Sequence, residues 1–262
     1  MKIKSTLLAF AAFSALGAVS SHGALLIGTS PITLNFDNLN TNFGGAYNST
    51  GGSSTFPINT TTGTAPIVIY SGTGGTEFTV STTDFNPGGV YSNTGTYSDS
   101  NSVRAFRDAS TLDLALGVKD SANRQFVLSL RNATGATASS WAVAYDIEQY
   151  SKGASATVFS FSYSLNGTTF ITTNLTGAAN VVGNNTAPVD ANLASVISTA
   201  RTGTITESIA NGGDIFFRWT YDHQAGTSNH MGIDNIVVTA IPEPSTALLG
   251  AFGVLALLRR RR

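Results

Sequence analysis

Two acidic side chains lie two residues apart in a segment where apolar and polar residues alternate. Asp146 and Glu148 stand in residues 141–148, where every second residue is large and apolar. A period of two is typical of a half-buried β-strand, on which both carboxylates point to the same side. Sandwich glycosidases use an acid and a nucleophile placed in this way. A third acid is missing at Ala144 and Tyr150, so a sugar-binding or calcium-facing role, or a solvated sheet face, is favoured over catalysis.

A second group of polar residues flanks the segment Gln224–Asn229. Asp222 and His223 precede it, and His230 and Asp234 follow it. A loop that folds back would bring these side chains together, and carboxylate and carbonyl oxygens are the ligands that Ca²⁺ prefers. Asp222, His223 and Asp234 are therefore candidate metal ligands, and calcium is the single cofactor that the pattern suggests. The alternative is that the acids cap turns and the histidines are exposed.

Aromatic side chains on the expected strands could stack against sugar rings. Trp141 and Trp219 are the largest of them. Together with Asp146 and Glu148 they form a candidate carbohydrate-facing set, if they line an open face of a sheet. Aromatic residues on alternating strands are more often packing residues, and the sequence does not tell which face is open.

Composition excludes several kinds of chemistry. The 262 residues include no cysteine, which removes disulfides, thiolate metal sites and a cysteine nucleophile. No Gly-x-Ser-x-Gly elbow, phosphate loop or dinucleotide fingerprint is present. Between the two ends of the chain, 14 acids face 8 bases, which disfavours binding to nucleic acid or to an anionic membrane. We expect no catalytic residues.

Periodicity and turn residues predict an all-β fold. Asn166-Gly167 predicts a two-residue hairpin, and Asn211-Gly212-Gly213 marks another turn. Residues 190–200 are the one candidate helix, with a loop as the alternative. About a dozen short strands without βαβ spacing predict an antiparallel β-sandwich, most simply a jelly roll, as one domain over residues 25–240. Besides 141–148, strands are expected at 31–36, 66–70, 77–81, 112–118, 126–131, 157–165, 168–174, 202–209, 214–221 and 231–239.

The first 24 residues are typical of a bacterial signal peptide. Two lysines come first, residues 7–19 are apolar, and small residues follow up to Gly23 and Ala24. We expect cleavage at Gly23 or Ala24, with a site after Ser20 as the alternative. The apolar run lacks the amphipathic pattern of a core helix. The chain is therefore expected to be exported across the inner membrane.

The other end of the chain, residues 241–262, has three parts in a fixed order. Pro242, Glu243 and Pro244 come first, and the two prolines should keep the junction extended and outside any sheet ladder. An apolar helix is expected at 247–258, whose 12 residues fall short of a full span. It suits transient membrane insertion better than permanent anchoring. The cationic cluster that should stay on the cytoplasmic side is Arg259, Arg260, Arg261 and Arg262.

This tail resembles the PEP-CTERM sorting signal of Gram-negative bacteria. The resemblance rests on the tripeptide Pro242-Glu243-Pro244, the apolar segment and the terminal arginines. It implies that an exosortase, a membrane-embedded transpeptidase-like enzyme, recognises the tripeptide and cuts there. Proteins with this signal accompany exopolysaccharide and biofilm production.

The body of the chain has a second resemblance, from Arg104 onward. It is similar to lectin-like jelly-roll modules of exported PEP-CTERM proteins, which implies a fold and a location more than an activity. The segments that carry the likeness are 106–108, 114–117, 131–135, 145–150, 217–219 and 232–236.

We therefore expect a non-catalytic protein of the cell surface or extracellular matrix, whose sandwich binds carbohydrate, with exopolysaccharide as a candidate partner. The alternative is a secreted polysaccharide hydrolase that uses Asp146 and Glu148. A third interpretation is a hydrated spacer without a ligand.

Overall fold

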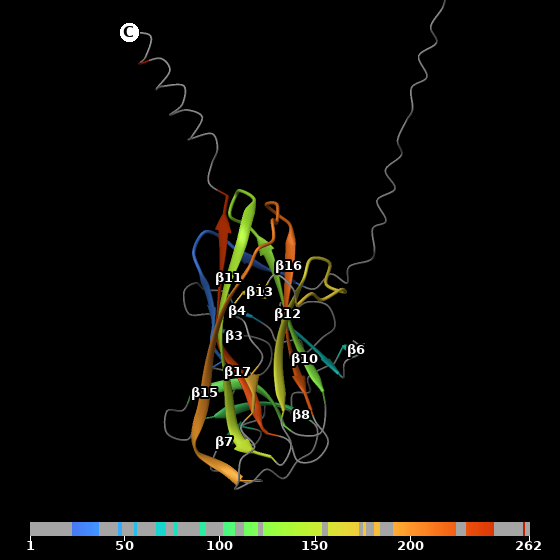
Figure 1. Ribbon diagram of the computed structural model, residues 1–262, viewed down its shortest axis with the longest axis vertical. Helices are drawn as coiled ribbons and strands as arrows, with labels where there is room; N and C mark the ends of the chain where they lie inside the picture. Colours follow the sequence, from blue (N-terminus) through green and yellow to red (C-terminus); the bar gives the residue numbers. More distant parts are fainter. Residues whose placement is uncertain are drawn as a thin grey trace, which may run out of the picture.

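The fold is an all-β sandwich. The computed structural model describes residues 23–36, 47–48, 55–56, 67–71, 76–77, 90–92, 102–107, 113–119, 123–153, 157–172, 175–176, 181–183, 191–223, 229–243 and 259. The elements named within these ranges are all β-strands, and most of them belong to two facing sheets (Figure 1). The sequence prediction of an all-β sandwich is thus confirmed.

The first sheet has the strand order β14-β12-β16-β10-β5-β6, with β1 also paired to β10. Neighbouring strands in this sheet are antiparallel, except that β1 and β10 are parallel to each other. The strands are β1 (Leu25–Ile27), β5 (Ile67–Ser71), β6 (Thr76–Glu77), β10 (Arg124–Asn132), β12 (Val158–Ser164), β14 (Val181–Val182) and β16 (Asp214–Asp222).

The second sheet has the order β13-β15-β11-β17-β9-β8-β7, with β2 also paired to β17. Here β7 and β8 are the parallel pair. The strands are β2 (Ile32–Leu34), β7 (Val90–Ser92), β8 (Ser102–Arg107), β9 (Leu114–Lys119), β11 (Ala138–Lys152), β13 (Leu175–Thr176), β15 (Ala191–Ile205) and β17 (Met231–Pro242). Two further short strands, β3 (Tyr47–Asn48) and β4 (Thr55–Phe56), pair with each other.

The core lies between the two sheets and is rich in aromatic side chains. Tyr145 of β11 contacts Phe161 of β12 and Trp219 of β16, with ring centroids 5.5 and 5.6 Å apart. Trp141 and Trp219 are 0% and 1% exposed. Such aromatic pairs add stabilisation to the burial of their large apolar surfaces. The inward set of β11 is the one that its period of two predicts: Trp141, Val143, Tyr145 and Ile147.

Two local predictions are wrong. Residues 191–200 form part of β15, which pairs with β11 from Lys152↔Ala191 to Trp141↔Ile205, and are not helical. These residues have only a weak local preference for helix or loop, and long-range pairing with the aromatic-rich strand β11 overrides it. The turn at Asn166 does reverse the chain, and Gly167 has φ 73°, but the flanking residues pair only at Tyr163↔Ile171. The connection is therefore a wider loop, held by the Asn166 side chain, which accepts hydrogen bonds from the backbone of residues 168 and 169.

One central strand in each sheet has an edge that two shorter strands share. Along β10, β5 pairs with Arg124–Leu128 and β1 with Leu130–Asn132. Along β17, β9 pairs with Met231–Ile233 and β2 with Ile236–Val238. β1 thus lies beside the mid-chain strand β10 and β2 beside the last strand β17, and each sheet has a break where one partner ends and the next begins.

The outer face of the second sheet carries a small apolar layer of its own, formed by Phe106, Ala115 and Tyr150. The Phe106 ring stacks on Tyr150 with centroids 5.1 Å apart. It also lies over Gly117, which pairs with Gly232 across β9 and β17. The absence of a side chain at Gly117 therefore creates the room that this ring occupies.

We predict that Gly117→Ala destabilises the protein by about 1 to 3 kcal/mol, the usual cost of overpacking a core. A Cβ at this position would come within 2.1 Å of the Phe106 ring and 2.7 Å of the Met231 carbonyl oxygen. Gly28→Ala is the matched control, because a Cβ there meets nothing within 4 Å. Urea unfolding of both variants measures the difference, and equal stabilities would contradict the proposed packing of Phe106.

Candidate functional site

The candidate site forms at the break along β17. Between the segments paired to β9 and β2, β17 carries one extra residue relative to β11, and the register shifts between Ala144 and Asp146. Asn235 has φ 50° there, in the left-handed region that asparagine tolerates better than most residues. Its amide donates to the Asp146 carboxylate over 3.1 Å. This β-bulge fixes the position of Asp234.

Asp234 is completely buried. Its Oδ1 accepts a hydrogen bond of 3.2 Å from the backbone N–H of Phe36, just beyond β2. Its Oδ2 is buried without a hydrogen-bond partner. Burial raises the pKa of Asp234 from 3.8 to about 8, helped by the nearby acids Asp113 and Glu148 and opposed by the N–H groups of Asn235 and Phe36. An uncharged carboxyl, or one that meets a cation, is the stable form in such a place.

Glu148 reaches the same place from β11. The inward positions of this strand are the odd-numbered ones, so Glu148 leaves from the outer face, where it is 5% exposed. The Tyr150 hydroxyl donates to Glu148 Oε2 over 2.5 Å. Burial and the neighbouring Glu148 raise the pKa of Tyr150, so the phenol stays protonated and can donate. Its ring is held by Phe106, which links the outer apolar layer to the carboxylate.

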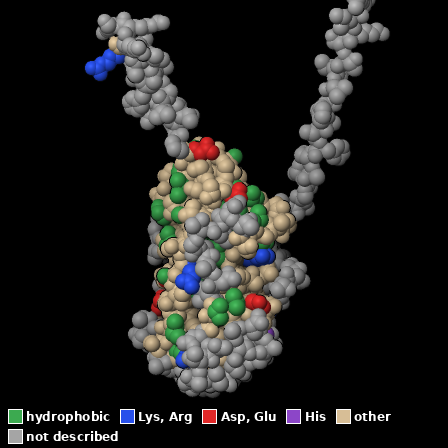
Figure 2. Space-filling model, viewed as in Figure 1, with side chains coloured by type: hydrophobic (Ala, Val, Ile, Leu, Met, Phe, Trp, Pro, Cys, Tyr) green, Lys and Arg blue, Asp and Glu red, His purple; other side chains and the backbone are tan. Residues whose placement is uncertain are grey.

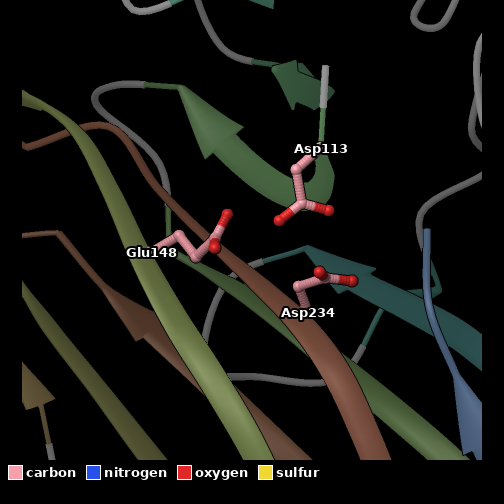
Figure 3. Close-up of side chains that lie close together, drawn as sticks. All are labelled: Asp113, Glu148 and Asp234. Carbon is pink, nitrogen blue, oxygen red and sulfur yellow. The ribbon is translucent and has the colours of Figure 1, made fainter. Parts of the chain in front are cut away.

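Asp113 completes the carboxylate cluster, which we define as Asp113, Glu148 and Asp234. Asp113 immediately precedes β9 and is half-buried. One carboxylate oxygen from each of the three residues lies within 4.8 Å of the others. Figure 3 shows the three side chains pointing toward a common space from separate parts of the sheet. The donors are all oxygens, the type that hard cations such as Ca²⁺ bind.

The cluster contains one of the three metal ligands that the sequence suggested. Asp234 belongs to it, but Asp222 and His223 lie at the end of β16 in the other sheet, and the group of potential ligands within the described ranges includes neither. The backbone N–H of His223 instead donates to Asn123. His230 is also outside the cluster: its ring stacks on Phe106 and bonds to Ser151. The prediction failed because β16, which ends at Asp222, and β17, which begins at Met231, belong to opposite sheets of the sandwich.

The carbohydrate-facing set is corrected as well. Trp141 and Trp219 are core residues and cannot stack on a sugar at the surface. Asp146 and Glu148 do leave β11 on one side, as predicted, but Asp146 bonds to Asn235 and Glu148 is enclosed by Tyr150. Asp113 was missed because it stood inside an expected strand, with no second acid nearby in the sequence to mark it.

The C-terminal junction is the other place where predicted functional residues lie. Pro242 is the last residue of β17 and is paired with Ala138, so the expectation that it stays outside the sheet is wrong. The pairing is irregular there, with a register shift between Ala138 and Ser140, and such irregularities are among the places where a sheet accommodates proline. Glu243 follows, its N–H donating to Thr137 over 2.9 Å and its carboxylate accepting from Ser208 over 3.2 Å.

The other residues of the predicted signal peptide and the predicted sorting tail lie at or beyond the limits of the described ranges. Gly23 is exposed and Ala24 half-buried, directly before β1. Residues 1–22, Pro244, the segment 247–258 and Arg260, Arg261 and Arg262 fall outside those ranges, and Arg259 is exposed. Among the residues that the structure describes, no helix has the length and apolar character to cross a bilayer.

Comparison with known proteins gives several distant structural likenesses. No family model matches the chain, and no curated protein matches it. The structure of TmCBM61 in complex with β-1,4-galactotriose is 12% identical over 48% of this chain and 69% of its own, with a TM-score of 0.28. The enzymatically active domain of tailspike protein 4 of bacteriophage CBA120 is 10% identical over 56% of this chain and 18% of its own, with a TM-score of 0.30. Likenesses this weak do not tell the function.

The raised pKa of Asp234 predicts that stability falls with rising pH. Between pH 3.8 and about 8 the folded carboxyl keeps a proton that the unfolded chain has lost. The folded state then binds more protons, so the free energy of unfolding decreases as pH rises, by at most about 1.4 kcal/mol per pH unit. In metal-free buffer, urea unfolding between pH 5 and 8 should show this loss.

Asp234→Asn replaces the protonated carboxyl by a neutral amide that can still accept from Phe36. We expect a flatter pH dependence in this variant than in the wild type. Asp222→Asn, at an acid in the other sheet, is the control and should keep the wild-type slope. Identical slopes in all three proteins would show that Asp234 is not the group that titrates.

Proposed function

We propose that this chain is an exported, non-catalytic protein of the cell surface or extracellular matrix of a Gram-negative bacterium, sorted through a PEP-CTERM tail. The observation that carries the proposal is the position of Pro242 and Glu243 at the end of β17. The last strand of the sandwich runs to Pro242, and Glu243 is bound to Thr137 and Ser208. The tripeptide that we propose as the sorting signal therefore begins at the last residue of β17, with no linker between the strand and the tripeptide.

The start of the sandwich supports the same proposal. Gly23 and Ala24 directly precede β1, whose first residue is already paired with Leu130 of β10. Cleavage of a signal peptide at either position would leave the whole sandwich intact. The partner that we propose for the tail is an exosortase-type transpeptidase, which meets Pro242, Glu243 and Pro244 at the outer face of the membrane. Residues 247–258 insert transiently, with Arg259 to Arg262 on the cytoplasmic side.

The proposed ligand of the sandwich is a neutral polysaccharide of the matrix. A shallow hollow of about 490 Å³ lies on the outer face of the second sheet. Among the described residues, those that line it are neither charged nor aromatic: Ala142, Val143, Ala144, Thr202, Gly203, Thr204, Val237 and Thr239. Threonine hydroxyls beside methyl groups can bind the hydroxyls and the apolar faces of a sugar chain. On the face that Figure 2 shows, the described part carries scattered acidic and basic side chains among mostly uncharged groups.

The non-catalytic part of the proposal is supported by the surroundings of the two acids on β11. A general acid or nucleophile must reach the reacting atoms of its substrate. Glu148 is 5% exposed and accepts a hydrogen bond from Tyr150, and Asp146 accepts one from Asn235. A hydrolase that uses this pair is therefore disfavoured.

The sorting proposal predicts two cuts in the mature protein. Its intact mass, measured in the native host, should correspond to a chain that begins near Gly23 or Ala24 and ends near Pro242. Deletion of the sorting enzyme should leave the C-terminal tail attached, and Glu243→Ala should do the same. Retention of Arg259 to Arg262 in the presence of the enzyme would contradict the proposal.

Ser208→Ala is the matched control for Glu243→Ala, because it removes the side-chain contact of Glu243 without changing the tripeptide. We expect tail removal to be at least as fast in this variant as in the wild type. A block in both variants would mean that the contact at Ser208, and not the tripeptide, governs processing.

The ligand proposal predicts that Ala144→Trp abolishes binding to a polysaccharide prepared from the host matrix, because the large ring fills the hollow. Ala136→Trp is the control, since Ala136 is exposed outside that hollow and the substitution is the same. Co-sedimentation with the polysaccharide measures both. A folded wild-type protein that binds no matrix polysaccharide would support the spacer interpretation instead.

A further inference from the structure

The carboxylate cluster places three acidic groups in a poorly hydrated part of the second sheet. Asp234 and Glu148 are 0% and 5% exposed, and among the described residues the ionisable groups that raise the pKa of Asp234 are Asp113 and Glu148. Buried charges in proteins are normally paired or bound to metal ions. The unpartnered Oδ2 of Asp234 is an independent sign of a missing positive group, because buried polar atoms nearly always have a partner.

We propose that a calcium ion binds between Asp113, Glu148 and Asp234 and joins the strands that meet at the β17 bulge. This site is separate from the sorting tail and from the hollow, so it goes beyond the proposed function. It also differs from the site that the sequence suggested, with which it shares only Asp234.

The spacing of the oxygens fits this ion. Ca²⁺ lies about 2.3 to 2.6 Å from each ligand oxygen, so two of its ligands can be as much as roughly 5 Å apart. The three carboxylates each offer an oxygen within 4.8 Å of the others. A single ion in the space that Figure 3 shows between them can therefore contact all three.

Two of the ligands are already oriented by neighbouring donors. The Phe36 N–H bonds to Oδ1 of Asp234 and leaves Oδ2 for the ion. The Tyr150 hydroxyl bonds to Oε2 of Glu148 and is itself held by the stacked ring of Phe106. Donors of this kind fix the plane of a ligating carboxylate and are a regular part of metal sites.

The donor set selects calcium among the common ions. It contains neither histidine nor cysteine, the ligands that Zn²⁺ and Cu²⁺ prefer. Mg²⁺ usually keeps several waters, which two side chains as buried as Asp234 and Glu148 do not favour. Ca²⁺ accepts an irregular set of carboxylates, and the half-buried side of Asp113 admits the waters that complete its shell.

The ion would join four strands. Asp113 lies at the start of β9, Glu148 on β11 and Asp234 on β17, and Phe36 connects Asp234 to the end of β2. These strands meet where the ladder along β17 is interrupted, so the ion compensates for pairing that the bulge removes. We therefore expect it to stabilise the fold.

The test uses the full-length chain, purified in a mild detergent and treated with a chelator. Thermal unfolding is followed by circular dichroism while CaCl₂ is added, and calorimetry measures the dissociation constant. At a calcium concentration 100 times that constant, the melting temperature should rise by roughly 5 to 10 °C. The same concentration of MgCl₂ should give a much smaller rise. An equal response to both ions would overturn the assignment to calcium.

Asp234→Asn and Glu148→Gln should each weaken calcium binding at least tenfold and abolish the rise in melting temperature. Asp222→Asn, which alters the site that the sequence suggested, should behave as the wild type does. Both cluster variants keep the shape of the side chain, so at least one is expected to fold in chelator, which its spectrum verifies. A calcium effect that survives in a folded cluster variant, or that is lost in Asp222→Asn, would refute the proposed site, as would a wild type that does not respond.

Discussion

The packing of one sheet on the other through aromatic side chains is the interaction on which the structure depends. Tyr145 of β11 lies against Phe161 and Trp219 of the opposite sheet. Because side chains alternate along a strand, burial of the odd-numbered positions of β11 commits the even-numbered ones to the outer face. Glu148 and Tyr150 are outer-face residues for this reason, and so the core determines which acids can meet outside it.

The bulge in β17 interrupts the regular alternation of side chains, and the candidate site forms at this interruption. An extra residue in one strand turns the side chains that follow it, so that Ile233 and Ile236 both face the core although they are three residues apart. Asp234 lies at the bulge, between the residues of β17 that pair with β9 and those that pair with β2. A regular ladder would have filled this place with backbone hydrogen bonds, and no buried carboxylate would have been needed there.

Strand β17 connects the features to which we assign roles. Its first half carries Gly232, which faces Gly117 below Phe106, and Asp234. Its second half packs Val238 and Ala240 into the core and then ends in Pro242, the first residue of the tripeptide that we propose as a sorting signal. Residues 239–242 pair with β11. The proposed calcium site and the start of the proposed sorting tail therefore belong to the same strand.

Much of this organisation could be predicted from local patterns. The period of two on β11, β16 and β17 indicated an all-β fold and the inward side of each strand, because burial of one face imposes that period directly. The two terminal signals remain predictions, each made from a contiguous segment. The first part of β15, residues 191–200, could not be predicted, because its pairing with β11 decides its conformation and its own residues do not.

The carboxylate cluster could not be predicted from the sequence either. Asp113, Glu148 and Asp234 are separated by 35 and 86 residues and come together only through the strand order β11-β17-β9. Sequence composition and periodicity thus determined the sandwich and its inward faces, and they predict the signals at its ends. The tertiary structure alone decided that both tryptophans are buried, that Asp222 and Asp234 belong to different sheets, and that the acids meet at a bulge. Strand order and register are long-range properties, which no segment of the chain specifies by itself.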